Sequence, residues 1–219
     1  MKIKRTIDKK GQRVLVISAH PDDTEFGCGG TIAKLITEGK EVYNLILSLR
    51  KKTVPPDFPK EELIRETLEA SGIIGIAEKN NIIKDYEHRI FPTIRQQILD
   101  EICSRAKEIK PDLVFTTSVD DTHQDHQVVA EETFRALKYT NIVSYGFPWN
   151  TILRRINLYS VIGEEDLEKK IKALKSYKSQ IPGRVYFSPD YIRSLAVTQG
   201  INIKEKYAES FEIVRWIWR

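Results

Sequence analysis

Two short polar segments contain residue types that can bind a metal ion and move protons. Residues 18–23 read Ser-Ala-His-Pro-Asp-Asp, and residues 121–126 read Asp-Thr-His-Gln-Asp-His. Three of the four histidines of the chain therefore lie beside paired carboxylates. Imidazole and carboxylate groups are the usual ligands of a catalytic zinc ion and also serve as general acids and bases. We expect the two segments to form one metal-dependent catalytic site.

Each polar segment follows a short apolar run that is typical of a buried strand. Val14–Ile17 precedes the first segment, and Leu113–Phe115 precedes the second. In an open α/β sheet, ligands bind beyond the carboxyl ends of the strands. Two such strand ends can therefore bring both segments to one edge of a sheet.

The order of the expected elements favours an α/β fold. Strands are predicted at 13–18, 41–49, 81–83, 112–116, 141–145, 156–162 and 210–218, and helices at 31–37, 60–71, 92–110, 125–138, 164–179 and 189–197. Strands and helices alternate through residue 145, which predicts a doubly wound, mostly parallel, Rossmann-like sheet with helices on both faces. Additional strand and helix elements follow at the C-terminus, with the last strand expected at an edge. At 219 residues, the chain fits a single domain spanning 1–219.

The histidines and one aspartate have the spacing of a zinc site. A catalytic zinc ion commonly has three protein ligands and one open position for water. His20 and Asp23 lie three residues apart on a turn predicted over 20–30, so both can contact one ion. Either His123 or His126 can supply the third ligand. The same nitrogen and oxygen donors suit Zn²⁺, and Fe²⁺ or Co²⁺ can occupy them too.

Two carboxylates remain beside this expected ion. Asp22 and Asp125 are not needed as ligands. A carboxylate next to metal-bound water can act as a general base, and a further histidine can polarise a carbonyl group or protonate a leaving amine.

The motifs resemble those of a known enzyme family. Residues 19–30, Ala-His-Pro-Asp-Asp-Thr-Glu-Phe-Gly-Cys-Gly-Gly, resemble the signature of the PIG-L/LmbE-like family of zinc-dependent N-deacetylases. The segment 123–126 resembles the second motif of that family, H-x-D-H. Weaker similarities follow at 65–72, 175–180 and 207–211, in family order. The resemblance covers nearly the whole chain.

The resemblance implies a role for each motif residue. The implied metal ligands are His20, Asp23 and His126. Asp22 would be the general base, and His123, oriented by Asp125, would stabilise the oxyanion. The implied reaction is hydrolysis of an acetamide on an N-acetylated amino sugar or its conjugate. Alternatives are another amide, such as an N-formyl or N-acyl group on a modified sugar or antibiotic precursor, and a non-catalytic metal- or sugar-binding module.

Four further residues are candidates for substrate binding. Arg65 can bind substrate or pair with a carboxylate of its own helix. Tyr145 and Trp149 follow a strand and can line a sugar site, although core packing is the alternative for each. Arg50 lies in a basic, proline-rich segment at 48–56, where Arg50, Lys51 and Lys52 can contact an anionic group; a solvated basic loop is the alternative.

Composition limits the other partners. The net charge is only +4 and no arginine-rich stripe is present, so nucleic-acid binding is not indicated. No segment reaches the length of about 20 apolar residues that a spanning helix needs. Residues 1–10 lack the apolar region of a signal peptide, and Cys28 and Cys103 form no CxxC motif, so a cytoplasmic protein is expected. Trp216 and Trp218 suggest a homo-oligomer contact or packing within the domain.

Overall fold

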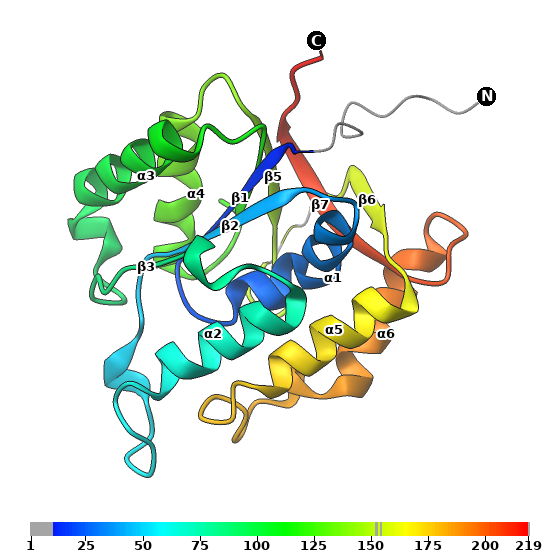
Figure 1. The fold of residues 1–219 in the computed structure, drawn as a ribbon, viewed down its shortest axis with the longest axis horizontal. Coiled ribbons are helices and arrows are strands. Elements are labelled where there is room, and N and C mark those ends of the chain that lie inside the picture. The colour runs from blue at the N-terminus through cyan, green and yellow to red at the C-terminus, as the bar shows by residue number, and fades with distance from the viewer. Residues whose placement is uncertain (1–10, 152, 154, 219) are drawn as a thin grey trace.

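The computed structural model describes residues 11–151, 153 and 155–218 and shows one mixed sheet between layers of helices (Figure 1). The strands are β1 Arg13–Ser18, β2 Glu41–Ile46, β3 Asn81–Ile83, β4 Leu113–Thr117, β5 Asn141–Tyr145, β6 Leu158–Val161 and β7 Ala208–Arg215. The helices are α1 Asp23–Thr37, α2 Glu62–Ile74, α3 Arg95–Ile109, α4 Gln124–Ala136, α5 Glu164–Lys175 and α6 Pro189–Ile201.

The strand order is β3-β2-β1-β4-β5-β7-β6. The first five strands in this order are parallel, whereas β7 runs antiparallel to β5 and β6 antiparallel to β7. The doubly wound, mostly parallel sheet is therefore confirmed. The chain winds outward from β1 to β3 and then returns to the other side of β1 with β4. The boundary between β1 and β4 is the switch point at which such sheets bind ligands.

Helices cover both faces of the sheet because the central strands are apolar on both faces (Figure 1). In β1, Val14 and Val16 belong to the core cluster under α1, α2 and α5, whereas Leu15 and Ile17 belong to the cluster under α3 and α4. This alternation follows from the two-residue period of a strand. The sheet thus separates two apolar cores and leaves its strand ends free to position polar groups.

Among the differences from the sequence predictions, three concern the first helix, the second helix and the last strand. The segment predicted as a turn over 20–30 is helical from Asp23, because three glycines are accommodated inside α1. Helix α2 continues through Gly72 and ends before Gly75, whose φ of 105° suits the left-handed C-cap. Strand β7 does not lie at an edge, because β6 pairs with its outer side.

The described residues contain no helix that combines the length and the apolar character needed to cross a membrane. The residues on which the signal-peptide reading depends, 1–10, lie outside the described part of the chain.

Tyr145 packs in the core, which corrects its expected role in substrate binding. Its side chain is 1% exposed, and its hydroxyl donates to the carbonyl oxygen of Ile17 at 3.2 Å. The ring lies against α1 at Gly27, where an added Cβ would lie 2.2 Å from Cδ2 of Tyr145. Gly27 of the first motif is therefore needed for close contact between α1 and β5 beneath the site.

We expect Gly27→Ala to lower the free energy of unfolding by about 2 kcal/mol, because the new methyl group overpacks the Tyr145 contact. Gly72→Ala is the matched control, since a Cβ there meets no atom within 4 Å. Alanine should stabilise this helical position by about 0.5–1 kcal/mol. Chemical denaturation of both variants checks the pair, and equal losses would contradict the packing account.

Candidate metal centre and catalytic site

Parallel pairing of β1 with β4 brings the two polar segments together. Each strand leads through a short loop into a helix, α1 after β1 and α4 after β4. The loops and the first helical turns carry His20–Asp23 on one side and Asp121–His126 on the other. The site therefore lies at the carboxyl ends of two adjacent strands, as expected from the sequence.

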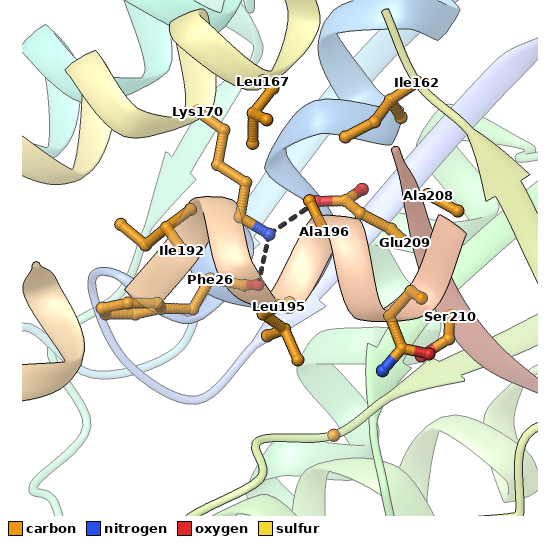
Figure 2. A pocket seen from close by; sticks show the side chains of 13 residues that line it. Phe26, Ile162, Leu167, Lys170, Ile192, Leu195, Ala196, Ala208, Glu209 and Ser210 are labelled. Atoms are coloured by element: carbon orange, nitrogen blue, oxygen red, sulfur yellow. Dashed lines mark hydrogen bonds and ion pairs between the residues drawn. The ribbon is translucent and has the colours of Figure 1, made fainter. Parts of the chain in front are cut away.

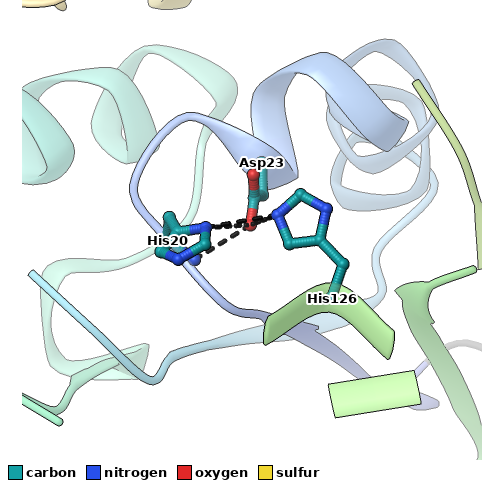
Figure 3. A group of neighbouring side chains, drawn as sticks. All are labelled: His20, Asp23 and His126. Carbon is teal, nitrogen blue, oxygen red and sulfur yellow. Dashed lines mark hydrogen bonds and ion pairs between the residues drawn. The ribbon is translucent and has the colours of Figure 1, made fainter. Parts of the chain in front are cut away.

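Three ligand atoms form a compact triangle (Figure 3). His20 Nδ1 lies 3.2 Å from His126 Nε2, and Asp23 Oδ2 lies 3.7 Å and 3.4 Å from these two nitrogens. A tetrahedral ion with bonds of about 2.0–2.1 Å separates its ligands by about 3.3 Å. All three side chains are buried and point toward one another. The triangle therefore has the size required for a zinc-like ion.

The carboxylate of Asp125 contacts His20 and not, as expected, His123, which Asp125 meets only through its backbone amide. Asp125 Oδ2 lies 3.1 Å from His20 Nε2, and the two carboxylate oxygens also accept from the backbone amides of Arg89 and Phe91 at 2.6 and 3.3 Å. His20, His123 and Asp125 form a second group of potential ligands. Because Asp125 is already engaged by two amides, it suits the role of a fixed hydrogen-bond acceptor better than that of a ligand.

His126 has an equivalent carboxylate partner in Asp121. Asp121 Oδ2 lies 2.8 Å from His126 Nδ1, while Asp121 Oδ1 accepts from the backbone amide of His123 at 2.8 Å. Asp121 is fully buried. Its position at the start of the second polar segment was the available signal, although the sequence alone favoured a loop or capping role.

The electrostatic environment favours the metal-binding forms of two of the three ligands. Burial lowers the pKa of His20 well below its ordinary value, which keeps the ring neutral. Burial opposes ionisation of Asp23, but the charge and hydrogen bond of His126 outweigh it and lower the pKa of Asp23 to about 2. Burial also disfavours protonated His126, yet Asp23 and Asp121 raise its pKa to about 10. The pocket thus attracts positive charge between Asp23 and His126.

Asp22 lies beside the triangle in a strained backbone conformation. Its φ is 76°, a left-handed value that aspartate tolerates better than most residues, and it immediately precedes α1. Burial and the Asp23 carboxylate raise the pKa of Asp22 to about 7, although Arg50 and Arg184 oppose the shift. Arg184 Nη1 lies 4.0 Å from Asp22 Oδ2. A carboxylate in this environment is suited to exchange a proton near neutral pH.

His123 forms the N-cap of α4. Its Nδ1 accepts from the backbone amide of Asp125 at 3.1 Å, so a neutral ring carries its proton on Nε2. The ring stacks on His126 with centroids 4.6 Å apart. Burial, followed by His126, lowers the pKa of His123. Capping thus leaves one N–H donor on a histidine beside the ligand triangle.

The basic residues considered for substrate binding differ in whether they already form ion pairs with carboxylates of the protein. Arg65 forms ion pairs within its own helix, with Glu62 at 2.5 Å and with Glu69 at 3.1 Å. Structure therefore favours the helix-pairing alternative for Arg65. In the basic loop, Lys51 and Lys52 pair with carboxylates at 85 and 87.

Arg50 differs from the two lysines that follow it. Its Nε is buried and has no hydrogen-bond partner among the described residues. Its charge acts on both Asp22 and His20. Arg184, which was not predicted from the sequence, acts on Asp22 as well and lies four residues after the weakly matched segment 175–180. The two arginines flank the candidate base.

Trp149 is part of an aromatic wall, which also includes residues missed in the sequence. The indole is nearly parallel to the rings of Tyr186 and Phe147, with centroid distances of 4.3 and 5.3 Å. Phe26 of α1 contacts the indole edge-on at 5.2 Å. Trp149 remains 38% exposed, so it packs against protein rings and still offers surface beside the site.

Asp125→Asn and Asp121→Asn should each weaken zinc binding by about 10- to 100-fold, because each removes the carboxylate that orients a ligand imidazole. Asp120→Asn is the matched control, since Asp120 lies in the same loop and its carboxylate contacts Arg155 instead. Competition with a chromogenic chelator measures the three affinities. Unchanged affinity in both test variants would contradict these roles.

Known proteins share both sequence and fold with this chain. Residues 15–137 match the family model PIG-L, described as GlcNAc-PI de-N-acetylase. Diacetylchitobiose deacetylase of Thermococcus kodakarensis is 24% identical over 94% of this chain and 85% of its own length.

Two solved structures show the same fold. The N,N'-diacetylchitobiose deacetylase of Pyrococcus horikoshii has a TM-score of 0.76, 23% identity, and coverage of 93% of this chain and 84% of its own. A 4-carboxy-2-hydroxymuconate hydratase of Pseudomonas putida has a TM-score of 0.77, 16% identity, and coverage of 95% and 98%. The fold therefore also occurs in an enzyme with different chemistry. The match to the PIG-L family model, by contrast, is a match in sequence and covers more than half of the chain. The chain belongs to the PIG-L family of deacetylases.

Proposed function

We propose that this protein is a zinc-dependent hydrolase that removes the N-acetyl group from an N-acetylated amino sugar or its conjugate. The observation that carries the proposal is the triangle of ligand atoms on His20, Asp23 and His126, with a carboxylate of raised pKa beside it. The similarity to a diacetylchitobiose deacetylase supports the amino-sugar substrate.

The ligand set suits the chemistry. Zinc bound by His20, Asp23 and His126 would act as a Lewis acid and lower the pKa of water toward about 7. Fe²⁺ or Co²⁺ fits the same donors. Asp125 and Asp121 would hold the two imidazoles in the required tautomer and orientation.

Three side chains would handle the protons and the developing charge. Asp22 would take a proton from the attacking water and return it to the leaving amine. His123 would donate its Nε2 proton as a hydrogen bond to the carbonyl oxygen, which becomes negative as water adds. The N-cap bond to Nδ1 fixes the ring for this task.

Arg50 and Trp149 are the proposed substrate contacts. Arg50 has a buried N–H with no hydrogen-bond partner in the described part of the chain, and its charge acts on Asp22, so we propose that it binds an anionic group of the substrate. Trp149 would contact the sugar with its exposed part.

Asp22→Asn should retain zinc but lower kcat by about 10²- to 10⁴-fold, because the base is lost while the ligands remain. His126→Ala should lose both zinc and activity. Metal analysis and acetate release from a panel of N-acetylated amino sugars test both variants, with the exposed Asp57→Asn as a control. Bound zinc without acetate release from any sugar would redirect the search to other amides, and absence of zinc binding would refute the catalytic proposal.

Arg50→Gln should raise KM about tenfold for N-acetylglucosamine 1-phosphate, since a charge-assisted hydrogen bond contributes about 1.5–3 kcal/mol. Lys52→Gln is the matched control from the same loop, because Lys52 is already paired with Glu87. Steady-state kinetics with the phosphorylated and neutral sugars compare the variants. An equal effect of both substitutions would argue for general attraction by a basic loop.

A further inference from the structure

Helix α1, which carries the first motif, is broken in its interior. Cys28 has φ −148° and ψ 15°, values outside the helical region. A non-helical residue interrupts the ladder of backbone hydrogen bonds and leaves amide and carbonyl groups that need other partners. In the buried interior of this protein, water is not freely available to supply them.

A buried ion pair supplies those partners (Figure 2). Lys170 Nζ donates to the carbonyl oxygen of Phe26 at 2.8 Å and to Glu209 Oε1 at 2.6 Å. Glu209 accepts from the backbone amides of Gly30 and Thr31 at 3.1 and 2.6 Å. The two side chains therefore bridge the break, with one contact before Cys28 and two after it.

The bridge comes from outside the helix. Lys170 belongs to α5 and Glu209 to β7, and both side chains are nearly buried, at 7% and 6% exposure. The backbone at Gly30 is crowded on this side, since an added Cβ would lie 2.8 Å from Cδ1 of Ile162 and 3.3 Å from Oε1 of Glu209. The glycine therefore permits the carboxylate to reach the backbone.

A buried ion pair is a poor device for stability alone. Desolvation of both charges can exceed their attraction, and well-packed apolar residues often serve a core equally well. This pair, however, lies next to the segment 23–27, which directly follows Asp22 and begins with Asp23. Catalytic geometry must be held within about 0.5 Å. A shift of this segment would move a metal ligand and the base together.

We propose that Lys170 and Glu209 are positioning residues that bridge the broken helix and hold Asp22 and Asp23 against His20 and His126. This inference rests on the proposed metal site. Neither residue contacts the reacting atoms in this scheme. Their effect passes through the backbone of α1, so it should appear in zinc affinity and in amide exchange of the metal-free protein.

The test separates positioning from charge balance. Lys170→Met leaves Glu209 unpaired and removes the donor to the Phe26 carbonyl oxygen, so it should lower Tm and weaken zinc binding at least tenfold. The double variant Lys170→Met/Glu209→Met removes both charges and should recover most of the lost Tm. Its zinc affinity should remain at least tenfold weaker than wild type, because the backbone groups around the break still lack their partners.

Glu101→Gln is the control for general destabilisation. Glu101 lies on α3, away from α1, and pairs with Arg105 of the same helix and with Lys84, which follows β3. The substitution should lower Tm without changing zinc affinity. Recovery of wild-type zinc affinity by the double variant, or equal weakening by Glu101→Gln, would overturn the proposal. If wild type binds no zinc, the proposed function fails. The double variant lacks the Glu209 acceptor, so hydrogen exchange at Gly30 and Thr31 should be faster in it, and unchanged exchange there would separately refute the bridge.

Discussion

The parallel pairing of β1 with β4 is the constraint on which the rest of the site depends. It places the carboxyl ends of these two buried strands next to each other, at the point where the winding of the sheet reverses. Segments more than 100 residues apart in sequence then contribute ligand atoms 3.2 Å apart. Helices pack on both faces of the sheet and bury these strands from both sides, which keeps the pairing in place.

Excess negative charge is concentrated at this junction and is compensated locally. Asp22, Asp23, Asp121 and Asp125 are all buried within a small volume. Backbone amides and imidazoles satisfy most of them, while Arg50 and Arg184 oppose the raised pKa of Asp22. Such an arrangement is costly for folding and is typical of sites that bind a cation or move protons.

The fold alone does not determine the reaction. A hydratase shares this architecture at a TM-score of 0.77, so the chemistry depends on the side chains at the strand ends and on the walls around them. In this chain the walls are an aromatic group around Trp149 and two arginines. The two arginines come from different parts of the chain: Arg50 lies in the loop after β2, and Arg184 lies in the segment before α6.

Periodicity and motif spacing predicted the sheet, the two polar strand ends and the candidate ligands, because these depend on local order along the chain. The pairing of Asp125 with His20, the burial of Tyr145 and the engagement of Arg65 could not be read in this way. Each depends on which side chains from distant elements meet, and helix–strand packing decides that. The sequence by itself thus determined the chemical groups and the strand ends that carry them; only the tertiary structure decided their partners, because buried carboxylates and imidazoles select contacts by proximity in space.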